Sequence, residues 1–179
     1  MTTCYCQIDS PLGPLFVQGD GQFVTGLYLP HHKGWSGPDA TWIQSDTPFT
    51  AVRSQLREYF AGDRQQFDVP IKLVGTSFQQ QVWQQLVQIP FGKTITYAEL
   101  ARRVGKPTAS RAVGNANGRN PISILVPCHR VIGTRGKLAG YAGGVEKKEW
   151  LLDWERTATP AEAGSLFAAE VVAAFVKGA

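Results

Sequence analysis

The stretch TYAELARRVGKPTASRAVGNANG, residues 96–118, has the pattern of two short helices joined by a tight turn. The apolar positions of the first predicted helix share one face: Leu100, Ala101 and Val104. Gly105 suits the turn, and Pro107 with Thr108 opens the second helix. The arrangement is typical of a helix-turn-helix. Because such patterns also arise by chance, the stretch alone leaves open both nucleic-acid binding and ordinary helix packing.

The second predicted helix is unusual because its outer positions carry small side chains. These are Ala109, Ser110, Ala112, Gly114 and Ala116. Arg111 is the one long charged side chain among them. Small side chains let a helix backbone approach its partner closely, which suits a tightly packed core. They equally suit a helix pressed into the minor groove of DNA, with Arg111 long enough to enter the base stack.

Directly after this helix comes NPISILVPCHRVIG, residues 120–133, an apolar run that holds a thiol, an imidazole and a guanidinium side by side. A cysteine among apolar residues is most often an inert, well-packed side chain. Here His129 and Arg130 are adjacent to Cys128 and are groups that could restore thiolate character. Pro127 fixes φ before the cysteine, and the amide of Asn120 could brace the turn.

A cysteine nucleophile needs a base, and the base needs a third group that orients it. The acidic side chains downstream of Cys128 are the candidates for that third group: Glu146, Glu149, Asp153 and Glu155. The residues alone do not choose among them.

The first half of the chain has an α/β pattern. The strand, hairpin and helix patterns fall at residues 4–8, at 14–29 with a turn at 19–21, and at 47–63. Residues 65–75 return to a strand pattern, while 30–48 form a loop. A new helix begins at Ser77, where residues 77–80 read as a capping box. No internal repeat is visible.

The positive charge is confined to one half. Residues 77–156 hold twelve Lys or Arg and five Asp or Glu, a net charge of +7, while the rest of the chain carries −3. This asymmetry favours a polyanionic partner for the second half, although a solvated basic face would look the same.

Three cysteines, an odd number, argue against a disulfide framework and favour the reducing cytosol. We see no signal peptide and no stretch long enough to span a membrane. Cys4, Cys6, His31 and His32 are the conceivable metal ligands of the N-terminal half. Their spacing is not a standard zinc pattern, so we expect no metal and no cofactor.

Pro127-Cys128-His129-Arg130 within ANGRNPISILVPCHRVIG, followed by GYAGGVEKKEWLL, resembles the O6-alkylguanine-DNA alkyltransferases, also called methylated-DNA–protein-cysteine methyltransferases. The resemblance runs from about residue 8 to residue 155 and includes DSPLGPL and REYFAG of the bacterial form. It implies an RNase H-like α/β domain with a small sheet and a helix over 1–75. It further implies a mainly helical domain with a winged helix-turn-helix over 76–156. The Ala-rich tail, 157–179, has no assigned role.

The resemblance also implies roles for individual residues. Cys128 would accept the alkyl group, His129 would draw the thiol proton through a water, and Glu155 would orient the histidine. Asn120 would brace the turn before the active site. The DNA-binding residues would be Arg111, Tyr97, Ala112, Gly114 and Ser110, with Arg111 filling the gap left by a flipped nucleotide and Tyr97 crowding the phosphate. The base pocket would be walled by Tyr141, Ala142, Gly143 and Gly144.

The expected function is thus repair of double-stranded DNA by single-turnover transfer from O6-alkylguanine to Cys128, with O4-alkylthymine left open as a second substrate. The expected protein is a cytoplasmic monomer able to bind DNA cooperatively. A non-catalytic helix-turn-helix regulator would leave the Pro-Cys-His-Arg run unexplained, and a cysteine hydrolase would leave the helix-turn-helix unexplained. The order of preference among alkyl groups is not predicted.

Overall fold

The computed structural model describes residues 2–138 and 140–158. The strands are β1 (Cys4–Ile8), β2 (Leu15–Gly19), β3 (Val24–Tyr28), β4 (Ile43–Gln44), β5 (Ile95–Thr96) and β6 (Val131–Ile132). The helices are α1 (Thr50–Ala61), α2 (Ser77–Val87), α3 (Tyr97–Arg103), α4 (Ser110–Gly118) and α5 (Val145–Thr157). Short 3-10 turns lie at Thr47–Phe49, Cys128–Arg130 and Thr134–Gly136. The predicted tail falls almost wholly outside the described residues.

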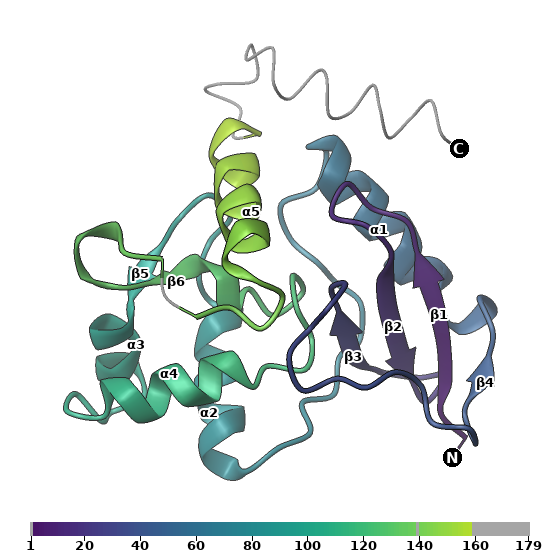
Figure 1. The fold of residues 1–179 in the computed structure, drawn as a ribbon, viewed down its shortest axis with the longest axis horizontal. Helices are drawn as coiled ribbons and strands as arrows, with labels where there is room; N and C mark the ends of the chain where they lie inside the picture. The colour runs from purple at the N-terminus through teal and green to yellow at the C-terminus, as the bar shows by residue number, and fades with distance from the viewer. Residues whose placement is uncertain (1, 139, 159–179) are drawn as a thin grey trace.

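The N-terminal half is a four-stranded sheet with α1 packed beside it (Figure 1). The strand order is β3-β2-β1-β4, antiparallel except for β4, which pairs parallel with β1. The predicted hairpin is confirmed: Asp20 Oδ1 accepts the backbone N–H groups of Gln22 and Phe23 and so closes the turn between β2 and β3. α1 turns its apolar face inward, burying Val52, Leu56, Tyr59 and Phe60.

The strand predicted at 65–75 is wrong. That segment makes an isolated bridge between Ile71 and Val24 of β3, with backbone hydrogen bonds from Val24 to Pro70 and from Lys72 to Val24. Pro70 has no N–H group to donate, so the pairing stops there. The loop predicted at 30–48 in turn contains the short edge strand β4.

The C-terminal half is mainly helical. The capping box of α2 lies one residue earlier than predicted. Thr76, not Ser77, is the N-cap, and it forms the capping box with Gln79. α3 and α4 form the helix-turn-helix, with Gly105 at φ +71° in the turn between them. β5 and β6 add a two-stranded parallel sheet. The predicted architecture of a small sheet with a helix, followed by a helix-turn-helix half, is confirmed.

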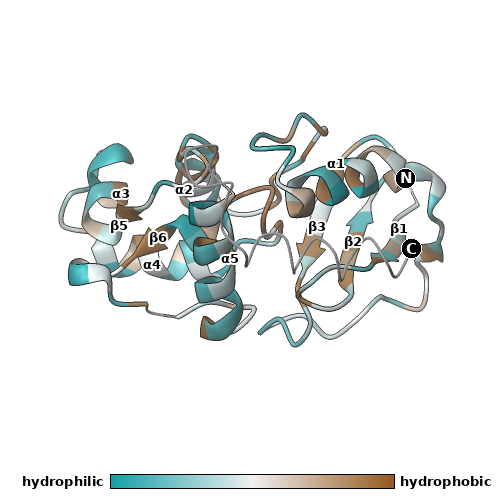
Figure 2. Cartoon of the chain, turned by 90° about the horizontal axis from the view of Figure 1, so that it is seen from above, coloured by the Kyte–Doolittle hydropathy of each residue, from teal (hydrophilic) through white to brown (hydrophobic). Residues whose placement is uncertain are grey.

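The two halves share one apolar core and meet along the edge of β3. Leu27 donates its N–H to Pro121 O over 2.8 Å, and Ser123 donates to Leu27 O over 2.9 Å. Buried apolar side chains from both halves form a single cluster. Figure 2 shows the halves side by side, with α5 between them and the apolar colouring of β6 inside the C-terminal half.

Candidate active site

The segment before Cys128 is folded by two three-residue turns. Leu125 N donates to Ser123 O over 2.8 Å, around Ile124 at φ +70°. Cys128 N donates to Val126 O over 2.8 Å, around Pro127 at φ −82° and ψ 65°. The first is the rare, strained form of the γ-turn, and the second is the common inverse form. A β-branched residue at positive φ is a true backbone outlier, so Ile124 marks strain at this site.

Asn120 forms hydrogen bonds that hold these turns together. Its Oδ1 accepts the N–H of Ile122 over 3.0 Å, and its Nδ2 donates to Val126 O over 2.8 Å. The same Nδ2 lies 3.1 Å from the sulfur of Cys128. Asn117, which the sequence did not single out, donates to the carbonyl of Cys128 over 3.3 Å. Two buried amides therefore fix the thiol and its backbone.

Cys128 is 4% exposed at the start of a short 3-10 turn. Burial raises the pKa of its thiol, and the Asn120 hydrogen bond and the charge of Lys148 partly offset that rise. The expectation that Arg130 supports the thiolate is wrong, because Arg130 is committed to Glu155 instead.

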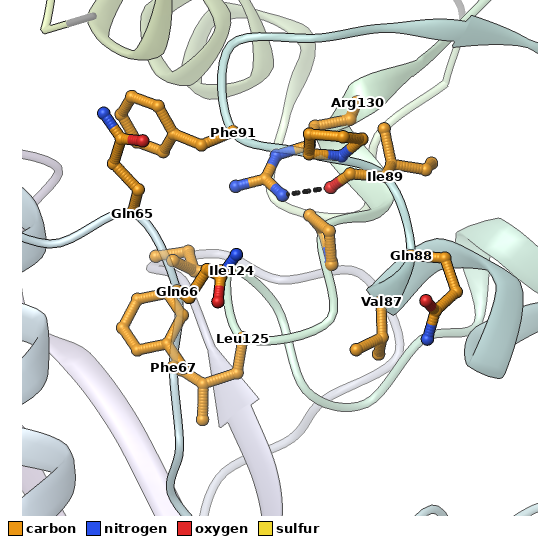
Figure 3. Close-up of a pocket in the computed structure, with 12 residues that line it drawn as sticks. Gln65, Gln66, Phe67, Val87, Gln88, Ile89, Phe91, Ile124, Leu125 and Arg130 are labelled. Atoms are coloured by element: carbon orange, nitrogen blue, oxygen red, sulfur yellow. Dashed lines mark hydrogen bonds between the residues drawn. The ribbon is translucent and has the colours of Figure 1, made fainter. Parts of the chain in front are cut away.

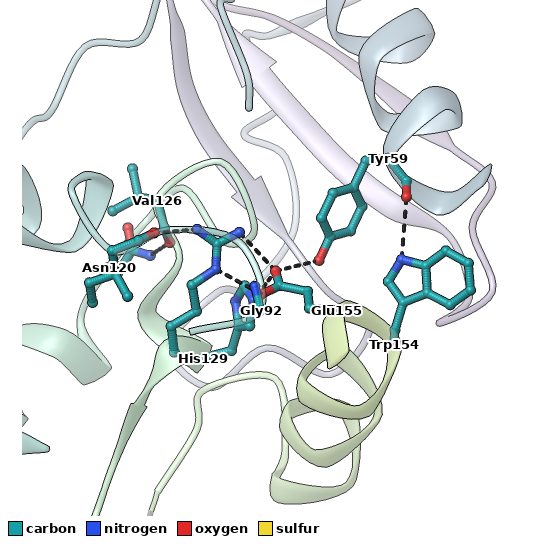
Figure 4. A network of polar contacts seen from close by, with 9 residues as sticks. Tyr59, Gly92, Asn120, Val126, His129, Trp154 and Glu155 are labelled. Carbon is teal, nitrogen blue, oxygen red and sulfur yellow. Dashed lines mark hydrogen bonds and ion pairs between the residues drawn. The ribbon is translucent and has the colours of Figure 1, made fainter. Parts of the chain in front are cut away.

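Glu155 is the acid that the structure brings to His129, and it is 1% exposed (Figure 4). Its Oε1 lies 2.8 Å from His129 Nε2 and accepts from Arg130 Nη2 over 2.8 Å. Its Oε2 accepts from Arg130 Nε over 2.8 Å and from Gly92 N over 3.1 Å. Burial alone would raise the pKa of this carboxyl, but His129 and Arg130 outweigh burial and hold the pKa well below its usual range. Glu155 is therefore a carboxylate.

The state of His129 follows from that of Glu155. A carboxylate only accepts hydrogen bonds, so the proton on the imidazole sits on Nε2. Nδ1 is then a free lone pair, and it has no hydrogen-bond partner among the described residues. Complete burial lowers the pKa of His129 despite the nearby carboxylate, so the ring is neutral and able to take up a proton.

Two further side chains were not found from the sequence. Tyr59 donates to Glu155 Oε1 over 2.8 Å from α1. Lys148, 0% exposed, donates to Val131 O over 2.6 Å and lies 5.8 Å from the centre of the Tyr97 ring. A signal for Lys148 did exist: its spacing to Leu151 puts a charge on the apolar face of α5. Tyr59 had no such signal, because tyrosine is ordinary on an apolar helix face.

The predicted DNA-binding residues lie on α3 and α4. Arg111 and Ala112 are exposed, and Ser110 and Gly114 are partly so. A side chain at Gly114 would meet the Tyr97 ring at 3.6 Å, so the two residues are in close contact. Ala116 is buried, so its assignment to the outer face is wrong, and its carbonyl accepts from Trp83 over 2.8 Å.

The predicted pocket loop follows the 3-10 turn at Thr134–Gly136. Burial, followed by the charge of Cys128, raises the pKa of the Tyr141 hydroxyl well above its usual range. The carbonyl of Ala142 accepts from Lys33 over 2.7 Å. Gly143 is buried where a Cβ would meet Leu29 at 3.2 Å, so this loop rests on the N-terminal half.

A separate cavity of about 380 Å³ opens between the halves (Figure 3). Its wall includes Gln65, Phe67, Phe91, Ile124 and Arg130. None of the residues predicted for the site lines this cavity, although Pro127 and Arg130, on either side of Cys128 and His129, do. Across 2–138 and 140–158, no group of three or more His, Cys, Asp or Glu side chains could hold a metal ion. Within the same ranges no helix has the length and apolarity to cross a membrane.

The fold and the site together define a helix-turn-helix protein that buries a cysteine beside a histidine–carboxylate pair. Both halves of the chain match domains of one protein family. Residues 3–73 match the family model for the ribonuclease-like domain of 6-O-methylguanine DNA methyltransferase, and residues 77–157 match that for its DNA-binding domain. The chain belongs to the 6-O-methylguanine DNA methyltransferase family.

Individual relatives agree. The chain is 47% identical to the methylated-DNA–protein-cysteine methyltransferase of Mycobacterium tuberculosis (strain ATCC 25618 / H37Rv), covering 88% of this chain and 95% of the relative. Identity is also 47% to the protein of the same name from Methanosarcina acetivorans, covering 84% and 97%. The crystal structure of M. tuberculosis OGT in complex with DNA superposes with a TM-score of 0.82 at 46% identity, covering 89% and 97%.

Proposed function

We propose that this chain repairs DNA by transferring an alkyl group from O6 of guanine to the sulfur of Cys128. The observation that carries the proposal is the set of contacts around the thiol. The Asn120 amide lies on the sulfur, and the adjacent His129 holds its Nε2 proton toward Glu155 and leaves Nδ1 without a partner. A buried thiol with a base and an oriented carboxylate is an activated nucleophile.

The step balances as follows. His129 Nδ1 takes the thiol proton, by way of a water, and becomes an imidazolium paired with Glu155. The thiolate of Cys128 forms a bond to the alkyl carbon while the bond from that carbon to O6 breaks. Guanine leaves with the electron pair and takes up a proton, for which the Tyr97 hydroxyl is the proposed donor. The proton that His129 took from the thiol then returns through solvent to Tyr97, so both side chains end neutral. Burial raises the pKa of Tyr97, followed by the charge of Cys128, so its hydroxyl keeps its proton until the base needs it.

DNA would bind against α4 through the minor groove. The exposed Arg111 and the small neighbours Ser110, Ala112 and Gly114 let the helix come close, with Arg111 filling the gap as the nucleotide turns out. Flipping is needed because a base within the duplex hides its O6 substituent from a buried thiol. The loop of Tyr141, Ala142, Gly143 and Gly144 would wall the pocket that receives the base.

The product at Cys128 is a thioether. Water does not hydrolyse it, and a thiol does not exchange with it as it would with a disulfide. Each molecule therefore acts once. The acceptor must remain a thiol, which suits a reducing cytoplasm, and the three cysteines are free. We further propose that the working form is a monomer that binds DNA cooperatively.

Labelled substrate tests the proposal. Incubation with duplex DNA carrying labelled O6-methylguanine should transfer at most one methyl group per chain, found by mass spectrometry on the Cys128 peptide. Cys128→Ala should lose all transfer yet still bind duplex DNA, with affinity that falls steeply with salt. A hydrolase would continue to turn over after a burst, and a regulator would take no label. Either result, or label on another residue, would overturn the assignment.

A further inference from the structure

The side chain of Tyr59 reaches from α1 to the carboxylate that holds His129 (Figure 4). Its hydroxyl donates to Glu155 Oε1 over 2.8 Å, the same oxygen that lies 2.8 Å from His129 Nε2. Tyr59 lies in the part of the chain matched by the ribonuclease-like domain, whereas His129 and Glu155 lie in the part matched by the DNA-binding domain. The carboxylate beside the proposed base is therefore bound from both halves.

Tyr59 is held firmly in this position. It is 0% exposed, and its carbonyl accepts the indole N–H of Trp154 over 3.3 Å. Three phenylalanine rings surround its own ring, with centroids 5.1, 5.4 and 5.8 Å away: Phe60, Phe67 and Phe91. With its backbone and ring both fixed, the hydroxyl has one direction to point, toward Oε1.

The hydroxyl also stays a donor. Burial, followed by the charge of Glu155, raises the pKa of Tyr59 well above its usual range, so the phenol does not ionise near neutral pH. A hydrogen-bond donor on Oε1 stabilises the negative charge of the carboxylate. It thereby weakens the attraction of the carboxylate for the imidazolium that forms at His129 during transfer.

We propose that Tyr59 is a positioning residue for alkyl transfer, which orients Glu155 and sets how strongly that carboxylate retains a proton on His129. The proposal rests on the function proposed above, with His129 as the base. It gives the N-terminal half a part in the chemistry as well as in the fold.

Other charged and titratable groups act on the same pair. They are Arg130, Lys148 and Tyr141. Arg130 and Lys148 lower the pKa of His129, and Glu155 raises it. A change confined to the Tyr59 hydroxyl leaves all of these groups in place, so its effect on the pH profile can be assigned to that hydroxyl.

The test is the single-turnover rate of transfer from duplex DNA containing one O6-methylguanine, measured across pH. His129 must be neutral to act, so the rate decreases as the pH falls; this decrease is the acid limb of the pH profile. In Tyr59→Phe the carboxylate lacks one donor and retains the imidazolium proton more strongly. The acid limb should then move to higher pH, with the rate below neutral reduced roughly tenfold, as for loss of a hydrogen bond to a charged group.

A second protein carries 3-fluorotyrosine at position 59. Its hydroxyl is the stronger donor and its size is nearly unchanged, so the acid limb should move to lower pH. Tyr28→Phe is the matched control, because it removes a hydroxyl from a half-buried tyrosine of β3 outside this network.

The outcomes are separable. Absence of transfer by the wild type and by Tyr28→Phe would refute the proposed function itself. Normal transfer by those two, with the wild-type acid limb in both position-59 proteins, would refute the role of Tyr59. A lower rate without any shift of the limb would show a structural role only and would also refute it. Should Tyr59→Phe fail to fold, the fluorotyrosine protein decides the question alone.

Discussion

The side-chain amide of Asn120 donates to the sulfur of Cys128 over 3.1 Å while its oxygen accepts the backbone N–H of Ile122 over 3.0 Å. One side chain thus contacts the nucleophile and also fixes the strained turn that presents it. Because Asn120 is 1% exposed, neither contact can be replaced from bulk water.

Replacing Asn120 with Ala should therefore impair both reactivity and stability. The unpaired groups left at Ile122 and Val126 should lower the free energy of unfolding by about 1–3 kcal/mol. The pKa of the Cys128 thiol should rise further, because the hydrogen bond that favours the thiolate is lost. Urea titration and thiolate absorbance against pH measure the two effects. Asn115→Ala, at an exposed position of α4, is the control for unfolding. A variant as stable as that control would contradict the bracing role.

Arg111→Ala should separate nucleotide flipping from chemistry. Without a side chain to fill the vacated stack, transfer from duplex DNA should slow by roughly one to three orders of magnitude, since unstacking costs a few kcal/mol. Reaction with the free base O6-benzylguanine needs no flipping and should change far less. Rate constants for both substrates provide the comparison, and an equal loss on both would remove the proposed role.

Acid should weaken the fold in two stages. Burial lowers the pKa of His129 in the folded protein, so the unfolded chain binds the proton more readily and stability falls as pH drops below about 6.5. The pKa of Glu155 is also lowered, so its contribution is complete above about pH 4.3 and is lost progressively below that value. His129→Gln should flatten the first stage in urea titrations at several pH values. The buried His32, whose pKa burial also lowers, should supply the part that remains.

The exposed His31 provides the matched control for that experiment. His31→Gln should keep the wild-type dependence of stability on pH. An equal flattening in both histidine variants would mean that the buried ring of His129 is not the source of the first stage.

Methylation of Cys128 should destabilise the protein. Cys128 is 4% exposed and its sulfur is in contact with Asn120, so an added methyl group overpacks its site at a cost of roughly 1–3 kcal/mol. The protein recovered after reaction with O6-methylguanine DNA should melt at a lower temperature than the untreated protein in calorimetry. An unchanged or higher Tm would show that the site already had room for the group.

The elements that depend on local pattern were predictable. Helices near 50–61 and 77–87, the hairpin and the helix-turn-helix follow from apolar spacing and from turn residues such as Gly105. The prediction of a strand at 65–75 was wrong because the segment pairs with the edge of β3 only at an isolated bridge. Pro70 has no N–H group and so limits the hydrogen-bond ladder there. The edge strand β4 has only two residues, which is too short for an alternating apolar pattern to show in the sequence.

The site was predictable only where neighbouring residues define it. Cys128 and His129 stand out in the chain, and the resemblance selected Glu155 from four acids. That Arg130 binds Glu155 rather than the thiol depends on how α5 crosses the 3-10 turn, which no local pattern encodes. The Tyr59 contact joins residues 96 positions apart and arises from tertiary packing alone.

The backbone bonds between Leu27 and the segment at Pro121 and Ser123 have one more consequence. The outer edge of β3 is covered at Leu27 by the stretch of chain that leads to the acceptor cysteine, and at Val24 by residues 70–72. An uncovered strand edge is a template for pairing with other chains. Any displacement of the acceptor segment would therefore uncover part of a strand edge able to pair with other chains.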